Sequence, residues 1–335
     1  MPNTSILAAA LIFVYFSSTL SAQQSASNSD LEIYQVRSNF YMLVGAGANI
    51  GVQIGSDGVV LVDTGSPDAS SKVLEAIRKL TALPIRYIIN TSADSDHVGG
   101  NEALARSGVG IGANGVPPAP GNDRNAAAAT IQAAIEVLNR MSAPSDKVSP
   151  FPVAAWPTET LVESDRIKSM ALNDDGIQII RAPGAHSDGD LMVLFRRADV
   201  IVAGDILDTT RFPVIDVEKG GSIRGEIAAL EHLIELTIPP TPLVWKQGGT
   251  FVLPANGYVC EQSDVVEYRD MMVVIRDTIR DLIKQGKTLD QIRQANPTLP
   301  YRARYGSDSG PRTTDMFVES VYKGLISENK QGGKQ

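Results

Sequence analysis

Three apolar runs in this sequence each lead into a segment rich in acids and histidine, and this recurrence constrains the fold more than any other feature. "YIIN" (87–90) continues into "TSADSDHVGG" (91–100), and similar segments follow at "APGAHSDGD" (182–190) and "VAGDILD" (202–208). Short apolar runs bounded by turn residues are typical of buried strands. Reactive side chains collect on loops at the ends of such strands. The sequence therefore predicts a layered α/β fold with its chemistry along one edge.

Strand-like and helix-like patterns alternate along most of the chain. Asp57-Gly58 marks a hairpin turn inside the second strand region. The expected strand regions are 32–45, 49–65, 85–90, 108–113, 177–182, 191–197, 200–207 and 250–257. The expected helices are 70–80, 101–107, 126–141, 223–236 and 264–286. This alternation predicts two sheets covered by helices.

The last of these helices carries the clearest pattern. Asp264 and Glu267 are spaced as a capping pair, and Gly286 is placed to end the helix. An apolar stripe follows helical spacing through Tyr268, Met271, Ile275, Ile279 and Leu282. Such a stripe predicts packing on a core.

Composition excludes one class of partner. The chain has 335 residues, of which 43% are hydrophobic, enough for the core of one large layered domain or two small ones. Its formal net charge is −8, so no basic surface for nucleic acid is expected. Cys260 is the only cysteine, which rules out an internal disulfide, and we expect it to be a small buried apolar residue.

The first 22 residues have the pattern of a secretory signal peptide. An apolar run leads to small residues, with Ala22 as the expected last residue before cleavage. The run is short for a membrane anchor, so no stable membrane insertion is expected after the signal is removed. The sequence thus predicts an exported protein, periplasmic or secreted, with residues 23–30 as a polar tether.

The remainder is predicted to form one domain and an extension. Residues 31–286 contain the alternating pattern. Within them, residues 113–156 are irregular and rich in proline, and such an insertion can form a lid beside a pocket. Residues 287–335 are expected to add short helices and a disordered end, "NKQGGKQ".

Several motifs, in this order, resemble those of the metallo-β-lactamase-fold hydrolases over about residues 31–275. They are "VLVDTG", "DHVGGN", "GAHSDGD" and "VAGDILD", and "LPANG" stands where the family carries P-G-H-G. The resemblance implies a four-layer αβ/βα sandwich. It also implies a hydrolase that acts on a small molecule through metal-activated water. Two motifs of the tail, "DVVEYRDM" and "TTDMFVESVY", are similar to an exported bacterial branch of the family.

The resemblance further implies a set of metal ligands. The family's ligand positions fall on Ser92, Asp94, Asp96, His97, His186, Asp205 and Asn256. One metal would be held at positions 92, 94 and 186 and a second at 96, 97 and 256, with Asp205 shared between them. Three positions have lost the family's histidine, namely Ser92, Asp94 and Asn256.

The ligands that remain indicate which metals the site suits. A catalytic zinc needs three good protein ligands and an open position for water. In one half-site Asp96, His97 and Asp205 suffice for one metal, and Asn256 offers only a carbonyl oxygen. The other half-site keeps Asp94, His186 and Asp205, and its neutral Ser92 is a poor ligand. Because carboxylates dominate, the preference shifts from zinc toward manganese, magnesium or iron. We expect a mononuclear site with zinc or another divalent metal, manganese or iron included.

Electrostatics gives a second argument for a cation. Asp94, Asp96, Asp188 and Asp205 would share one pocket, where like charges repel. Either a cation is bound, or some of these acids are protonated or face solvent. Asp96 is the candidate catalytic residue, since it could protonate the leaving group.

Other polar residues receive structural roles. Asp63 is expected to make turn and hydrogen-bond contacts, and Asp188 and Asp190 to pin their loop. His232 lies among helical neighbours and is given no role.

Two functions stay open. The first is an exported hydrolase of an ester, thioester, lactone or amide with an altered site. The second is a catalytically silent binding or scaffold protein on the same fold. Metal content distinguishes them.

Overall fold

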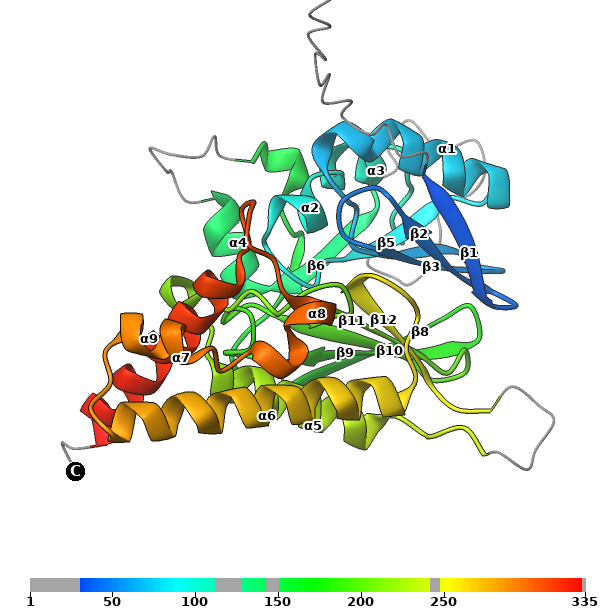
Figure 1. Ribbon diagram of the computed structural model, residues 1–335. Coiled ribbons are helices and arrows are strands. Elements are labelled where there is room, and N and C mark those ends of the chain that lie inside the picture. Colours follow the sequence, from blue (N-terminus) through cyan, green and yellow to red (C-terminus); the bar gives the residue numbers. More distant parts are fainter. Residues whose placement is uncertain (1–30, 112–127, 143–150, 165, 242–247, 333–335) are drawn as a thin grey trace, which may run out of the picture. The chain divides into compact units, whose positions relative to one another are not determined.

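The computed structural model describes residues 31–111, 128–142, 151–164, 166–241 and 248–332, which all belong to one compact unit, Leu31–Gln335 (Figure 1). The predicted signal peptide and tether lie outside the described residues, as do large parts of the predicted 113–156 insertion and the last three residues of the tail. Among the helices that are described, none combines the length and apolarity that a bilayer span requires.

The first sheet has seven strands. They are β1 (Glu32–Arg37), β2 (Phe40–Val44), β3 (Ile50–Gly55), β4 (Gly58–Val62), β5 (Ile85–Ile89), β6 (Thr130–Ala134) and β7 (Glu159–Leu161). Chain order is also sheet order, with antiparallel pairing from β1 to β4 and parallel pairing from β4 to β7. Gly55 pairs with Gly58, which confirms the hairpin predicted at Asp57-Gly58.

The second sheet has five strands. They are β8 (Ile167–Leu172), β9 (Asp175–Arg181), β10 (Leu191–Phe195), β11 (Val200–Asp208) and β12 (Phe251–Asn256). Their order in the sheet is β12-β11-β10-β9-β8, and β11 and β12 pair in parallel. The strands predicted near 177–182, 191–197, 200–207 and 250–257 are all present.

Helices connect and flank the strands. The α-helices are α1 (Ser70–Leu80), α2 (Ser95–Val98), α3 (Asn101–Arg106), α4 (Ile135–Ser142), α5 (Ile223–Leu236), α6 (Gln262–Lys284), α7 (Leu289–Ala295), α8 (Arg302–Tyr305) and α9 (Thr314–Gly332). Short 3-10 turns are η1 (Pro67–Ala69), η3 (Val153–Ala155), η4 (Val217–Lys219) and η5 (Leu299–Tyr301). The bounds of α1 and α5 agree with the prediction.

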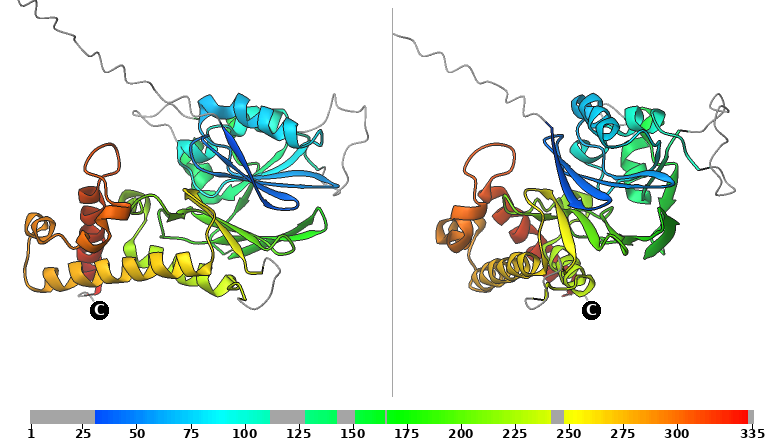
Figure 2. Two further views of the ribbon diagram at one scale, coloured as in Figure 1. Left: turned by 45° about the vertical axis from the view of Figure 1, so that its right-hand side comes forward. Right: turned by 90° about the vertical axis from the view of Figure 1, so that its right-hand side faces the viewer.

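The two sheets lie face to face, with α1 and α3 outside the first and α5 and α6 outside the second (Figures 1 and 2). Three buried clusters fill the three interfaces. Phe40, Val60 and Ile89 of the first sheet pack on the second sheet. Leu61 packs toward α1 and α3 on the other face. The outer face of the second sheet packs on α5, α6 and the C-terminal helices, as at Ile201. This confirms the predicted four-layer αβ/βα sandwich.

The helix predicted at 126–141 is wrong over its first part, where residues 130–134 form β6. Its alanines favour a helix locally, but the segment pairs in parallel with β5 and β7 and is buried there, and sheet pairing overrides propensity. The strand predicted at 108–113 is absent from its described residues, 108–111. Gly108 and Gly110 offer a strand no side chains to pack.

The long helix α6 is present, but its cap is not the predicted one. Glu261 is the N-cap residue, and its side chain forms a capping box with Asp264 at the third helical position, so Asp264 and Glu267 do not form the pair. Of the predicted stripe, Tyr268, Met271, Ile275 and Ile279 are buried. Cys260 is also buried, as expected.

Candidate metal centre

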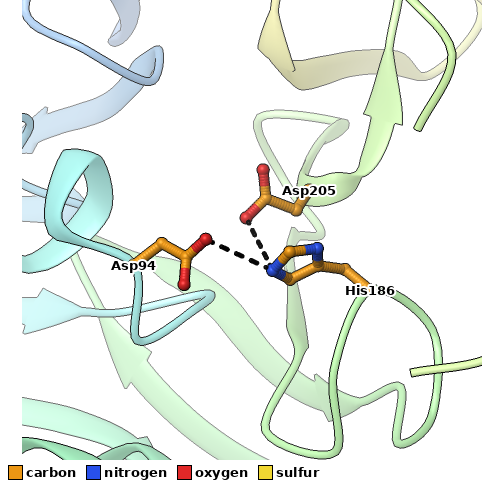
Figure 3. A group of neighbouring side chains, drawn as sticks. All are labelled: Asp94, His186 and Asp205. Carbon is orange, nitrogen blue, oxygen red and sulfur yellow. Dashed lines mark ion pairs between the residues drawn. The ribbon is translucent and has the colours of Figure 1, made fainter. Parts of the chain in front are cut away.

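Segments from both sheets bring the acid- and histidine-rich sequences together. Asp94 lies in the loop after β5 and precedes α2, whereas His186 lies in the loop between β9 and β10. Asp205 lies within β11 itself. Figure 3 shows these three side chains pointing toward one another from separate parts of the chain.

The three side chains form a compact ligand group. One ligand atom from each of Asp94, His186 and Asp205 lies within 4.8 Å of the other two. Nε2 of His186 is 3.4 Å from Oδ2 of Asp94 and 3.8 Å from Oδ2 of Asp205. The sequence left two reduced ligand sets, Asp96, His97 and Asp205 in one half-site and Asp94, His186 and Asp205 in the other. The group found here is the second of these sets.

A local backbone distortion positions Asp205. The register between β11 and β12 shifts on both sides of Gly204, which has a φ of +56°. A Cβ atom at Gly204 would lie 2.5 Å from Oγ1 of Thr91. Only glycine meets both demands. The bulge therefore sets the direction of the Asp205 carboxylate.

His97 lies on the other side of Asp205. Its Nε2 is 3.1 Å from Oδ2 of Asp205, and its Nδ1 is 2.9 Å from Oδ2 of Asp63. Asp63 also accepts hydrogen bonds from the backbone N–H and the hydroxyl of Thr91, at 2.8 and 2.6 Å. Asp63 has a φ of +65°, an uncommon conformation for aspartate. Its predicted role as a hydrogen-bond residue thus includes orienting an imidazole.

The unpaired atoms in this group fit a divalent cation. Nδ1 of His186 is 2.8 Å from the carbonyl oxygen of Val214 and donates to it, which leaves Nε2 available for a ligand. Nε2 of His97, Nε2 of His186 and Oδ2 of Asp205 are buried and make no hydrogen bond of good geometry. Buried polar atoms are otherwise almost always satisfied. Nε2 of His186 and Oδ2 of Asp205 are two of the three ligand atoms of the group, and buried atoms without hydrogen bonds are what a metal site offers. Nε2 of His97 lies beside them, against Oδ2 of Asp205.

Charges around the group are strongly coupled. Burial disfavours the imidazolium form, but the charges of Asp205, Asp190 and Asp94 and the hydrogen bond to Asp94 together outweigh it and raise the pKa of His186 to about 10. The charges of Asp205 and Asp63 likewise overcome burial and raise the pKa of His97 well above its ordinary value. Burial opposes ionisation of Asp205, yet His97 and His186 lower the pKa of that carboxyl. A bound cation would compete with the protons on both histidines.

Cationic side chains of the protein also neutralise these acids. Nζ of Lys219 is 3.2 Å from Oδ1 of Asp94, and Arg140 pairs with Asp188. The sequence argument considered a bound cation, protonated acids or acids that face solvent, and protein cations are a further way to balance these charges. The segments that supply these cations are distant in the sequence, and folding brings them to the loops.

Asp96 is not part of this group, and the degenerate positions Ser92 and Asn256 have surroundings of their own. The Asp96 carboxylate is 3.9 Å from the guanidinium of Arg312. Consecutive helical residues point roughly 100° apart, so Asp96 and His97 on α2 face different directions. Ser92 is buried, and its hydroxyl accepts a hydrogen bond from the N–H of Asp94 at 3.3 Å. Asn256 ends β12 with its amide Nδ2 buried and unpaired.

The loop that carries His186 is pinned by its own acids. Asp190 accepts hydrogen bonds from the backbone N–H and the hydroxyl of Ser187, at 2.6 and 2.8 Å. Burial raises the pKa of Asp190 to about 6.

Lys219, Arg312 and the buried Glu226 were not anticipated as neighbours of this site. No local motif marks them.

Comparison with known proteins agrees with this architecture. Residues 44–241 match the family model described as the metallo-beta-lactamase superfamily. A double mutant of the sec-alkyl sulfatase PisA1 of Pseudomonas sp. superposes with a TM-score of 0.62 at 12% identity, covering 91% of this chain and 52% of the sulfatase. The chain therefore spans about half the length of that enzyme.

Two lactamases are similar in fold. A metallo-beta-lactamase from Pontibacter korlensis gives a TM-score of 0.52 at 15% identity, covering 72% of this chain and 98% of that protein. The DIM-1 metallo-beta-lactamase gives 0.51 at 15% identity, covering 72% and 97%. No curated protein matches the sequence.

Proposed function

The chain belongs to the metallo-beta-lactamase superfamily, and from this premise we propose that it is a hydrolase using one divalent cation held by Asp94, His186 and Asp205. The observation that carries the proposal is the convergence of three ligand atoms within 4.8 Å. Zinc, manganese and iron are the candidates, since the set mixes imidazole with carboxylates. The substrate is a small ester, thioester, lactone or amide. The signal-like residues 1–22 support export, to the periplasm or the medium.

The protein's own residues orient the two imidazole rings and transfer a proton during the reaction. Val214 fixes the ring of His186 through Nδ1, and Asp63 fixes the ring of His97 in the same way. When bound, a divalent cation polarises the scissile carbonyl and makes water a better nucleophile at neutral pH. The Asp96 carboxylate, partly exposed at the edge of the site, would take a proton from the attacking water and pass it to the leaving atom.

A second candidate is a silent binding protein on the same fold, and one observation favours it. Basic and acidic side chains alternate through the site, and charged atoms of neighbouring side chains are at most 3.8 Å apart. The order is Lys219, Asp94, His186, Asp205 and His97. Such alternation neutralises the acids without a metal. Metal binding must displace protons from this chain, so its affinity decides between the candidates.

Metal content tests the proposal. The full chain is supplied in turn with zinc, manganese and iron, freed of excess metal, and measured by elemental mass spectrometry. We expect about one ion per chain for one of the metals. Asp205→Asn should hold less than about a tenth of that, because the shared carboxylate is lost. Asp188→Asn is the matched control and should bind as the unmodified protein does, since Asp188 pairs with Arg140.

Less than about a tenth of an ion per chain in the unmodified protein, with every metal, would refute the hydrolase and support the silent candidate. Hydrolysis of ester, thioester and lactone probes by the loaded protein then tests the reaction class.

A further inference from the structure

A cavity of about 410 Å³ lies beside the metal centre, between residues 211–218 and residues 305–323. Its volume is within the range of small-molecule sites. Aromatic rings line one side. Phe212 and Phe317 stack with centroids 4.9 Å apart and an interplanar angle of 1°, and Tyr305 lies 5.9 Å from Phe212. This wall suits an apolar group.

The cavity is connected to the metal centre through its own lining residues. Val214 lines it and accepts the hydrogen bond from Nδ1 of His186. Arg312 lines it and lies 3.9 Å from the carboxylate of Asp96. Burial raises the pKa of Asp205, and His97 and His186 lower it most. The charge of Arg312 also lowers the pKa of Asp205, so Arg312 lies close to that carboxyl. A molecule in the cavity would therefore have one end next to the centre.

The cations that line the cavity differ in how well they are paired. Arg211 is 2.6 Å from the carboxylate of Asp208, and Lys323 is 2.7 Å from Glu319. Arg312 has, among the described residues, only the ion pair with Asp96 at 3.9 Å. Its side chain is 25% exposed. Arg312 is thus the lining cation best able to accept a further anion.

Hydrolysis of an ester, a thioester, a lactone or an amide always yields a carboxylic acid. The oxygen of water bonds to the acyl carbon, the bond from that carbon to the leaving heteroatom breaks, and the leaving atom takes up a proton. The new carboxylic acid then loses its proton to solvent and becomes a carboxylate. A cation beside the reacting carbonyl, followed by an apolar cavity, is the arrangement that an apolar acyl group requires.

We propose that this cavity is the acyl subsite: it receives an apolar acyl chain against Phe212 and Phe317, and Arg312 binds the carbonyl end and the product carboxylate. This assignment rests on the proposed function and names its substrate class, the acyl compounds of medium chain length. Residues 305–323 lie beyond the matched segment 44–241, so the C-terminal extension supplies half of this subsite.

Binding of the product analogue octanoate tests the subsite without turnover. The full chain, with no metal added, is titrated with sodium octanoate, sodium acetate and 1-octanol by calorimetry. Octanoate should bind at least about 100-fold more tightly than acetate, because its longer chain buries more apolar surface. Arg312→Gln should weaken octanoate about 10-fold or more and leave 1-octanol unchanged, whereas Arg312→Lys should keep most of the affinity.

Two further variants separate the cavity from its charge. Ser320 lines the cavity from α9, and Ser320→Trp should fill it and abolish binding of both octanoate and 1-octanol. Lys284→Gln removes a cation outside the cavity, on α6, that is paired with Asp281, so it should bind octanoate as the unmodified protein does. Unchanged melting temperatures show that each variant is folded.

The assignment is overturned if octanoate does not bind below about 10 mM, if Arg312→Gln binds it as tightly as before, or if Ser320→Trp leaves binding intact. Metal content is measured separately. A chain that binds octanoate through Arg312 but holds no metal would refute the hydrolase alone and keep the cavity as a site for apolar carboxylates.

Discussion

Two histidines at the centre are oriented by different acceptors. His97 donates from Nδ1 to a carboxylate, Asp63, whereas His186 donates to a backbone carbonyl, that of Val214. A carboxylate partner raises the basicity of an imidazole more than a neutral carbonyl does. The two rings therefore present the same nitrogen to the site with unequal affinity for protons and cations.

A buried acid near the centre is not used by this chemistry. Glu226, on α5, is 0% exposed, and neither carboxyl oxygen has a hydrogen-bond partner among the described residues. Burial, and then the charge of Asp190, raise the pKa of Glu226 well above its ordinary value. An acid whose pKa is higher in the folded state binds more protons there than in the unfolded chain. Its contribution to stability is therefore present at low pH and is lost as pH rises toward the folded-state pKa.

Glu226→Gln should remove this dependence. We expect its free energy of unfolding to exceed that of the unmodified protein at pH 8 by about 1 kcal/mol or more, since each unit of pKa shift is worth about 1.4 kcal/mol. The difference should shrink toward pH 5. Urea denaturation at several pH values measures it. Glu231→Gln, on the exposed side of the same helix, is the control and should show little change. A pH-independent difference would contradict the explanation.

The start of α5 supports the loop that carries His186. Ser222 caps the helix, accepting from the N–H of Gly225 at 3.0 Å, and its own N–H donates to the carbonyl of Gly184 at 2.9 Å. A Cβ atom at Gly225 would lie 1.8 Å from that carbonyl oxygen. The close approach of helix and loop therefore depends on glycine.

Gly225→Ala should both destabilise the fold and displace the loop. Overpacking against backbone costs about 1–3 kcal/mol, which outweighs the gain in helix propensity of about 1 kcal/mol. We also expect a loss of metal affinity, because His186 moves with its loop. Thermal unfolding and the metal assay measure the two effects.

Gly324→Ala is the matched control on α9. Nothing lies within 4 Å of a Cβ atom there, so the variant should gain about 0.5–1 kcal/mol in stability and bind metal unchanged. If both glycine variants were stabilised, the contact between α5 and the His186 loop would not be as tight as the structure describes.

Within the compact unit, contact between the two sheets holds the halves of the site together. Asp94 comes from the first sheet's loops, and His186 and Asp205 come from the second sheet. Phe40 of β2 and Phe195 of β10 meet edge to face between the sheets, with centroids 4.8 Å apart, and both are 0% exposed. This pair is part of the core that sets the spacing of the elements that carry Asp94, His186 and Asp205.

Phe195→Ala should cost about 3–5 kcal/mol of stability, since it leaves a cavity between the sheets. In a double-mutant cycle with Phe40→Ala, the coupling energy should be about 0.5–1.5 kcal/mol. Urea denaturation gives both values. Tyr34→Ala, at a side chain that is 48% exposed, should cost much less. Additive losses at Phe40 and Phe195 would show that the rings do not interact energetically.

Much of the fold could be read from the sequence because its signals are local. The helices at 70–80 and 223–236 follow from apolar periodicity, and the β3–β4 hairpin follows from Asp57-Gly58. The prediction failed at residues 130–134, where helix-favouring alanines pair with strands that are distant in the sequence. Periodicity reports on the neighbours along the chain, whereas the environment of β6 is set by other strands.

The candidate site divides in the same way. The sequence by itself determined the family resemblance and that Asp94 and His186 lie in loops at strand ends, because these motifs are contiguous; Asp205 lies within β11. Only the tertiary structure decided which acid faces His186, and that Lys219 reaches Asp94 across 125 residues. Side-chain direction and long-range charge pairing depend on how the layers pack, and no local pattern of residues carries that information.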